Sequence, residues 1–519
     1  MANHLIIAPI ALPLLVGAVL VMLEKAQSRW APAVSLASTL ALVWVAVQLL
    51  LQARGGQVQA YLLGNWQAPW GIALALDRLS ALMLVLTSVV ALASLVYALG
   101  GDDRKGLHFH ALLQFQLMGL NGAFLTADLF NLFVFFEVLL AASYGLLLHG
   151  ASTERLRASV HYVVFNLTGS ALFLVAVSLL YALTGTLNMA DLAVKLPHLG
   201  PENVKLVQAA VLLLVVVFGV KAALLPLYFW LPATYAAASA PVAALFAIMT
   251  KVGVYAIARF STLTTGSGSG YLSGLLSTVL PLLALSTLAL AAIGAFAAQQ
   301  LRGLVAYLVV ASAGTLLLAI GLGTPGTLAA GLFYLVNSTL VGCLWFLLAD
   351  RIAWARGGDD GLSAHGLQHG WAGFGALFFV AAVAVAGVPP LAGFLGKVLL
   401  LQAAGTTPHG PWVVGLVLAS SLMVMVALAR AGSRLFWKPT SATALRVAPP
   451  RPVHHAALIG LLLLVLLTAV FAGPLQTYAQ ATTRQLIVRQ PYIDAVLGAQ
   501  PVPPAHDVRR EMRERGELK

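Results

Sequence analysis

The sequence is poor in charged residues and has almost no cysteine. Of its 519 residues, 9% are charged and 60% are hydrophobic, whereas an ordinary soluble domain carries about 25% charged residues. The composition therefore excludes a soluble protein and predicts a chain whose surface mostly faces lipid. The single cysteine, Cys343, stands inside an apolar run, which excludes a disulfide framework and the paired cysteines of zinc and iron–sulfur centres. We expect no cofactor and no bound metal.

Acidic residues are also scarce: there are 17, against 29 lysines and arginines, and the net charge is +12. In a membrane protein this excess raises the question of how the basic residues divide between the two faces, and we expect no nucleic-acid partner. The loops that connect the predicted helices alternate between the two faces of the membrane. The loops of one face hold few basic residues, namely Arg54, Lys195, Lys205 and Arg259. By the positive-inside rule both termini lie outside. The other set of alternate connections holds Lys25, Arg29, Arg104, Lys105, Arg155, Arg157, Arg302, Arg351, Arg356, Arg430, Arg434, Lys438, Arg446 and Arg451.

Apolar runs long enough to cross a bilayer recur along the chain. About 20 apolar residues in a helix cover a hydrocarbon core of about 30 Å. The runs predict an all-α polytopic membrane protein with about 14 transmembrane helices. The first has no basic n-region and is interpreted as a retained helix rather than a signal peptide. The runs stand at 5–23, 31–52, 73–98, 109–126, 129–149, 158–183, 204–231, 241–260, 276–298, 303–323, 327–349, 371–405, 411–436 and 455–473.

Two of these runs are interrupted by proline. The 204–231 run contains Leu225-Pro226, and the 371–405 run contains Gly387-Val388-Pro389-Pro390. Proline removes a backbone donor and clashes with the preceding turn, so both helices should break near the middle of the membrane. An ordinary proline kink is the simpler interpretation of either break alone. Two broken helices in corresponding positions of two halves are typical of transporters.

Four ionisable residues stand deep in apolar runs. Glu137 is the one acidic residue so placed, and Lys221, Lys251 and Lys397 are the lysines. Each costs roughly 2.5–3.5 kcal/mol at the centre of a membrane helix, so the cost must be relieved by pairing, hydration or loss of charge. A static ion pair is the structural alternative, but one carboxylate cannot pair with three lysines. Because a moving partner can load or release a proton, the set indicates movement of protons or sodium ions rather than catalysis.

Further polar residues accompany this set. Lys251, Tyr255 and Arg259 recur every four residues and form one stripe on a helix, although such a tyrosine is more often a packing residue. Asp77 and Asp128 stand near helix starts, where capping is the simpler role. Other polar residues could bind water between the charged sites, or could serve only in helix–helix hydrogen bonds: His161, Asn166, Ser312, Thr315, Asn337 and Ser338.

Several long motifs carry a resemblance to a known family. The motifs are TADLFNLFVFFEVLLAASYGLLLHG at 126–150, TGTLNMADLA at 184–193, VKAALLPLYFWLPATY at 220–235, TKVGVYAIAR at 250–259 and GVPPLAGFLGKVLLLQ at 387–402. Together they resemble the D-type membrane chain of the Mrp-type (Pha, Sha) monovalent cation/proton antiporters. That superfamily also includes the antiporter-like subunits of respiratory complex I and of membrane-bound hydrogenases. The resemblance covers about residues 1–498.

The resemblance implies a domain plan: helices 1–3 in 1–108, two inverted five-helix repeats in 109–260 and 276–436, a last helix in 455–473 and a polar tail in 474–519. Helices 7 and 12 are broken in the family. Its charged axis matches Glu137, Lys221, Lys251 and Lys397 residue by residue. One position departs: the family motif YLVHST reads YLVNST here, with Asn337 in place of histidine. Asparagine can bind water but cannot hold a proton near neutral pH.

The resemblance therefore predicts a membrane subunit of a multisubunit sodium/proton antiporter. It would be a multi-pass protein of the bacterial cytoplasmic membrane, acting with other subunits on H⁺ and Na⁺ or another monovalent cation. One alternative is a proton-pumping subunit of a redox complex, which has the same architecture and other partners. A second alternative is a scaffold without transport of its own. In that case, neutralising the buried charges would harm assembly more than ion flux.

Overall fold

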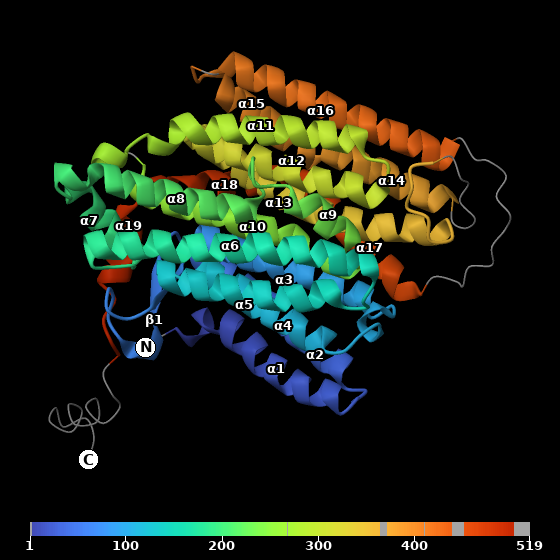
Figure 1. The fold of residues 1–519 in the computed structure, drawn as a ribbon, viewed down its shortest axis with the longest axis horizontal. Coiled ribbons are helices and arrows are strands. Elements are labelled where there is room, and N and C mark those ends of the chain that lie inside the picture. The colour runs from blue at the N-terminus through green and yellow to red at the C-terminus, as the bar shows by residue number, and fades with distance from the viewer. Residues whose placement is uncertain (1–2, 267, 364–370, 409, 438–450, 503–519) are drawn as a thin grey trace.

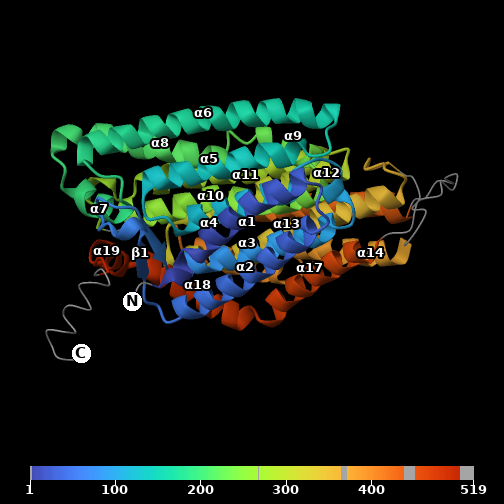
Figure 2. The same cartoon turned by 90° about the horizontal axis from the view of Figure 1, so that it is seen from below.

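The computed structural model describes residues 3–266, 268–363, 371–408, 410–437 and 451–502. Long helices lie side by side along one axis (Figures 1 and 2). Within the described ranges, 12 helices are long and apolar enough to cross a membrane. The chain is thus a multi-pass helical membrane protein, as the sequence predicts.

The elements follow in chain order, with short 3₁₀ and π turns between some of them. They are α1 (Ala8–Lys25), α2 (Ala31–Ala53), β1 (Gln59–Leu62), β2 (Ala73–Leu76), α3 (Arg78–Ala98), α4 (Phe109–Leu125), α5 (Leu129–Leu148), α6 (Thr153–Thr184), α7 (Met189–Lys195), α8 (Val204–Ala222), α9 (Trp230–Ala237), α10 (Ala240–Thr264), α11 (Leu275–Ala297), α12 (Leu301–Leu322), α13 (Pro325–Ala355), α14 (Trp371–Ala386), α15 (Ala392–Gly405), α16 (Gly410–Gly432), α17 (Pro452–Val470), α18 (Ala472–Ile487) and α19 (Gln490–Leu497).

One end of the bundle carries the two-stranded antiparallel sheet β1–β2 together with α7 and α19 (Figure 1, left). We call this the outer end, because the distribution of basic residues predicts that it faces outside. Asp77 follows β2 and caps α3, accepting a hydrogen bond from Ser80 N, and Asp128 caps α5 in the same way through Asn131 N. The capping role predicted for both carboxylates is therefore confirmed.

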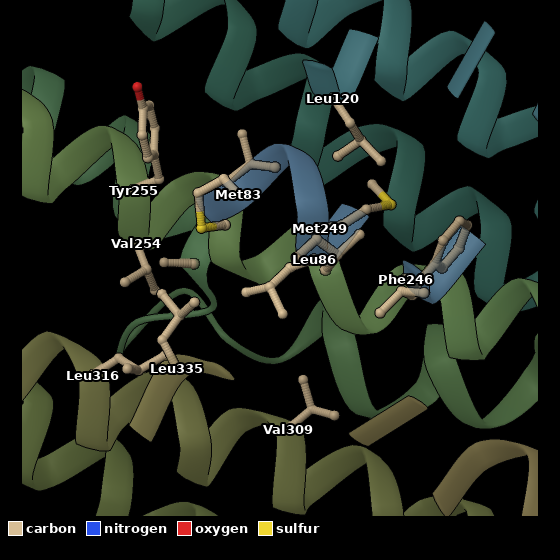
Figure 3. Packing of buried hydrophobic residues seen from close by; sticks show 14 of the residues in the cluster. Met83, Leu86, Leu120, Phe246, Met249, Val254, Tyr255, Val309, Leu316 and Leu335 are labelled. Atoms are coloured by element: carbon tan, nitrogen blue, oxygen red, sulfur yellow. The ribbon is translucent and has the colours of Figure 1, made fainter. Parts of the chain in front are cut away.

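The helices α10 and α13 form the centre of the bundle. The most apolar 18-residue stretch of α10 is entirely buried, and its side chains meet those of four neighbouring helices. Met249 of α10 lies near Met83 of α3 and Leu120 of α4, and Val254 of α10 lies near Leu316 of α12 and Leu335 of α13 (Figure 3). A lysine on α10 is therefore enclosed by protein on all sides, whereas α6 and α16 keep one face toward lipid.

Both predicted breaks are present. The first separates α8 from α9, and Ala223 there adopts a left-handed φ of 56°. The backbone groups that the break frees find partners: Leu225 N–H donates to Thr287 Oγ1 at 2.9 Å, and Trp230 Nε1 donates to Val220 O at 3.1 Å. The second break separates α14 from α15 at Gly387, whose φ is +78°.

The structure differs from the sequence interpretation at two places near the outer end. The sequence places Arg259 in a connection, but α10 continues to Thr264 and buries Arg259 to 3% exposure. The helix can continue because Asp77 neutralises that charge. The predicted polar tail is also partly ordered, because α18 and α19 are helical and bury Ala479 and Tyr492. Residues 503–519 lie outside the described part of the chain.

Candidate functional site

The four charged residues singled out in the sequence lie on four helices: Glu137 on α5, Lys221 on α8, Lys251 on α10 and Lys397 on α15. These helices contact one another in series, from α5 through α6, α8, α10 and α13 to α15. Lys221 is 7% exposed and Lys251 1%, while Glu137 and Lys397 are half-buried. Among the described residues, no ion pair joins Glu137 to a lysine. The static ion pair that the sequence left open is therefore not what the structure contains.

The helix α6 connects Glu137 with Lys221. Ser170 Oγ donates a hydrogen bond to Glu137 Oε1, and Lys221 Nζ donates to Asn166 Oδ1 at 3.1 Å. Asn166 and Ser170 are one helical turn apart on the same face of α6. The carboxylate and the ammonium therefore influence each other across two neutral polar groups rather than in direct contact.

A glycine brings α10 against the broken end of α8. A Cβ on Gly253 would lie 2.5 Å from Ala222 N and 2.7 Å from Phe218 O, so no larger residue fits without moving a backbone. This close approach packs the helix of Lys251 against the last turn of α8, which carries Lys221. A glycine two residues after a buried lysine in an otherwise helical pattern was the available sequence signal.

Lys251 is hydrogen-bonded to a serine hydroxyl of a neighbouring helix. Its Nζ donates to Ser312 Oγ of α12 at 2.6 Å, and Ser312 Oγ lies 2.7 Å from Val309 O. Within the described residues, this is the one hydrogen-bond partner of the ammonium. A neutral hydroxyl does not fix the charge of a buried amine, whereas a carboxylate partner would.

Lys397 is held by the second break. Its Nζ donates to Ala386 O at 2.8 Å and to Ser421 Oγ at 3.0 Å. Ala386 is the last residue of α14, where carbonyl groups have no partner in the helix and favour a cation. A Cβ on Gly387 would lie 2.7 Å from Lys397 Cδ. Glycine is thus required there both by the positive φ and by the passing lysine.

Two small cavities lie between Lys251 and Lys397. The first, of about 10 Å³, is lined by Ser312, Tyr334, Asn337 and Ser338. The second, of about 20 Å³, is lined by Tyr334, Thr315, Ser421 and Lys397 itself. Each has about the room that one water needs. Most of the first cavity's lining is apolar, and Asn337, Ser312 and Ser338 are among its polar members. Asn337 Oδ1 is buried and has no partner among the described protein atoms, so it is a group that a water there could bind.

Tyr255 and His161, which were also singled out in the sequence, lie away from the row of lysines. The Tyr255 hydroxyl donates to Phe124 O at 2.6 Å and accepts from Arg259 Nη2 at 3.3 Å, so it faces the outer end rather than Lys251. His161 is exposed on α6, with Nδ1 3.3 Å from Arg157 O. The structure does not bring His161 to the row of lysines; it lies near the start of α6 and lines a surface pocket together with Glu154 and Arg302. No group of three or more potential metal ligands is brought together in the described residues.

Comparison with known proteins gives a consistent result. Residues 126–425 match the family described as "NADH:quinone oxidoreductase/Mrp antiporter, TM". A protein of Rhizobium meliloti (strain 1021), named as the D chain of a probable K(+)/H(+) antiporter, is 42% identical, over 96% of this chain and 98% of its own length. The corresponding D chain of the Na(+)/H(+) antiporter of Bacillus subtilis (strain 168) is 35% identical, over 95% and 99%.

Solved structures share the fold over nearly the whole chain. A chain of the Mrp complex from Dietzia sp. DQ12-45-1b superposes with a TM-score of 0.86 at 26% identity, covering 96% of this chain and all of that one. A chain of the archaeal membrane-bound sulfane sulfur reductase gives 0.87 at 26% identity, covering 95% and 100%. The relatives decide between an antiporter and a redox complex. The Rhizobium meliloti and Bacillus subtilis proteins are both named as antiporter subunits, and both match over nearly their full length. The chain therefore belongs to the NADH:quinone oxidoreductase/Mrp antiporter transmembrane family, and within it to the D-type subunits of multisubunit monovalent cation/proton antiporters.

Proposed function

We propose that this subunit conducts protons through Glu137, Lys221, Lys251 and Lys397, and that the complete antiporter couples this movement to a monovalent cation. The observation that carries the proposal is the polar connection across an otherwise apolar core. Lys251 contacts Ser312, Ser312 lines the cavity at Asn337, and Lys397 lines the next cavity. Ionisable groups inside a membrane bundle mark ion or proton pathways by default.

In the first half, charge on Glu137 favours a proton on Lys221, since an opposite charge nearby stabilises the charged form. Protonating Glu137 removes that support. Lys221 then releases its proton toward Lys251, whose hydroxyl partner allows it to be charged or neutral. Asn166 and Ser170 of α6 bind Lys221 and Glu137, respectively, and so hold these two side chains at a fixed separation.

In the second half, the proton passes from Lys251 through Ser312 and through water in the two cavities to Lys397. Water bound at Asn337 and Ser338 takes the place that histidine holds in the family motif. The unwound segment beside Lys397 then offers a way out, because irregular backbone at membrane depth is tolerated where it lines a hydrated cavity.

The two halves of the fold are proposed to be inverted five-helix repeats, at 109–260 and 276–436. Each half contains one interrupted helix with a lysine at the break: Lys221 at the end of α8 and Lys397 near the start of α15. We infer about fourteen spans. The short α4 and the interrupted pair α14–α15 supplement the twelve long helices.

Partner subunits are proposed from the surface around Glu137. This carboxylate is half-buried, and Phe130 and Val134 are 48% and 39% exposed on the same helix. An ionisable group on an apolar, lipid-facing surface is costly, and another subunit of the antiporter would cover it. The bacterial relatives support a place in the bacterial cytoplasmic membrane, and their names leave both Na⁺ and K⁺ as candidate cations.

The test uses inverted membrane vesicles that carry the complete antiporter complex. Addition of Na⁺ or K⁺ should dissipate an imposed pH gradient, and vesicles whose complex lacks this chain should not respond. Cation-independent activity driven by an electron donor would favour the redox-complex alternative. Loss of the partner subunits from the membrane, rather than loss of flux, would favour the scaffold.

A further inference from the structure

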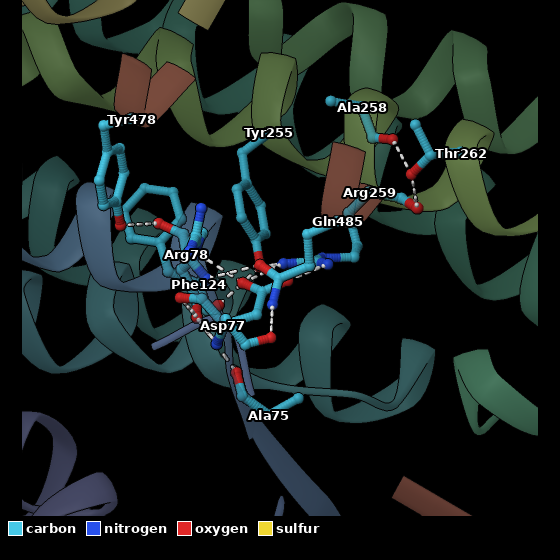
Figure 4. A network of polar contacts seen from close by, with 12 residues as sticks. Ala75, Asp77, Arg78, Phe124, Tyr255, Ala258, Arg259, Thr262, Tyr478 and Gln485 are labelled. Atoms are coloured by element: carbon cyan, nitrogen blue, oxygen red, sulfur yellow. Dashed lines mark hydrogen bonds and ion pairs between the residues drawn. The ribbon is translucent and has the colours of Figure 1, made fainter. Parts of the chain in front are cut away.

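A buried ion pair that the proton route does not use lies at the outer end of the bundle. Arg259 of α10 binds Asp77 at the start of α3 through two contacts: Nη1 to Oδ2 at 2.6 Å and Nη2 to Oδ1 at 2.7 Å (Figure 4). The side chains are 4% and 1% exposed. Such a bidentate pair is the strong form of an arginine–carboxylate contact.

Aromatic rings enclose the guanidinium. The ring centres of Tyr255 and Tyr492 lie 5.4 and 5.0 Å from Arg259 Cζ, within the range of a cation–π contact. Tyr255 belongs to α10 and Tyr492 to α19, while Phe124 O of α4 accepts from the Tyr255 hydroxyl. Four elements, α3, α4, α10 and α19, thus close around one side chain.

The helix α18 packs beside this cluster. Gln485 accepts from Arg78 N at 3.0 Å and donates to Gly56 O at 2.9 Å, and the Tyr478 hydroxyl donates to Arg78 O at 2.8 Å. Figure 4 shows Gln485 and Tyr478 next to Asp77 and Arg78. The C-terminal helices α18 and α19 are therefore packed into the bundle rather than forming a loose tail.

The ion pair lies between Lys251 and the outer surface. Lys251, Tyr255 and Arg259 share one face of α10, and eight residues of helix place Arg259 about 12 Å farther along the axis than Lys251. The second half is different, since Lys397 is half-buried beside the unwound segment. The first half thus has a tightly packed ion pair between its lysine and the surface, whereas the second half has an unwound segment beside its lysine.

We propose that the Asp77–Arg259 pair seals the outer end of the first half, so that a proton on Lys251 cannot leave there and must continue to Lys397. This inference rests on the proposed proton route. A proton would need a chain of water or titratable groups past the pair, and the enclosed guanidinium provides neither, because arginine keeps its proton. A cationic side chain in a narrow passage also excludes protons from pores. Asp77 and Arg259 are then sealing residues rather than members of the route.

The experiment replaces both charges together, because removing one leaves the other buried and uncompensated. Asp77→Asn keeps the helix cap, since Asn and Asp cap equally well. In vesicles that carry the complete complex, Asp77→Asn with Arg259→Ala should raise the proton leak measured without Na⁺ or K⁺. We expect a rise of about tenfold, which corresponds to about 1.4 kcal/mol of barrier.

The matched control is the Asp191–Lys195 pair on α7, at 2.9 Å, in which the aspartate is buried and the lysine is exposed. Asp191→Asn with Lys195→Ala should leave the leak at the native level. Adding Lys251→Met to the sealing variant should bring the leak back down, because the escaping proton comes from Lys251. An assembled sealing variant without extra leak overturns the inference, and so does a leak that Lys251→Met does not reduce.

A second variant decides the matter if the double replacement does not assemble. Tyr492→Ala opens one side of the guanidinium and leaves the ion pair in place, so it should raise the leak to a smaller extent, and a native leak would overturn the seal. Lys251→Met alone provides a separate reading of the proposed function. If it retains native antiport, the proton route is wrong, whatever the sealing variants do.

Discussion

Lys251 Nζ lies 2.6 Å from Ser312 Oγ. Ser312 belongs to α12 and lines the cavity at Asn337. Ser312 is thus the point where the buried lysine of the first half meets the polar space of the second. Its neutral hydroxyl can accept from the ammonium and can donate when the amine is neutral. The contact therefore permits either protonation state of Lys251.

Ser312→Ala should slow antiport about tenfold or more while the complex still assembles, because the hydroxyl is lost and a buried ammonium keeps no partner. Ser312→Thr restores a hydroxyl and should recover much of the rate. Cation-dependent dissipation of a pH gradient in vesicles measures both. An alanine variant with the native rate would show that the proton leaves Lys251 by another path.

Glu137→Gln should abolish antiport and leave assembly intact. The amide keeps the volume and the contact with Ser170, but it cannot take up a proton. Subunit content of the purified complex is the control for assembly. Near-native antiport in an assembled complex would remove Glu137 from the route.

Lys397→Ala should block transport, because the carbonyl of Ala386 and the hydroxyl of Ser421 lose their proton donor. Lys397→Arg should not restore it, since arginine cannot release its proton in this range. Full activity of the arginine variant would mean that fixed positive charge at the break is sufficient. Antiport rates at several cation concentrations distinguish a loss of rate from a loss of cation affinity.

Asn337→Leu should impair antiport, because it removes the amide that can hold water in a cavity of about 10 Å³. Asn337→His should leave the rate largely unchanged near neutral pH and add a pH dependence near the unperturbed histidine pKa of about 6.5. A pH–rate profile of each variant measures this. The native rate in the leucine variant, with assembly verified, would place the route away from this residue.

The outer seal should be insensitive to pH across the physiological range. Burial alone would raise the pKa of the Asp77 carboxyl, but the charge of Arg259 and the hydrogen bonds outweigh burial and hold that pKa below its usual range. The stabilising contribution of a carboxyl with a lowered pKa is present above the unfolded pKa of about 3.9 and is lost only as pH falls through the folded value. The basal proton leak should therefore stay constant between about pH 5 and 9. A leak that rises at pH 6 would contradict this.

The sequence predicted the parts of the site that depend on composition and helical spacing. A lone acid in an apolar run and prolines inside two long runs carry a clear energetic signal, which is why Glu137 and both breaks could be predicted. Contacts between segments that are far apart in the sequence leave no such energetic signal in it. Neither the pairing of Asp77 with Arg259 nor the facing of Ser170 toward Glu137 follows from spacing, because each depends on how helices far apart in sequence are packed. His161 stands out in the sequence by its type alone, and the rotation of α6 decides its exposure.

The half-buried position of Glu137 on the surface of the bundle has a consequence for biogenesis. A newly inserted copy of this chain carries Glu137 only half-buried, and its charge is disfavoured beside lipid until another subunit covers it. The chain on its own therefore begins with an incomplete entrance for protons. On the proposed route, surplus copies of this chain would leave the proton gradient of the cell intact, because their entrance at Glu137 would be completed only in the assembled complex.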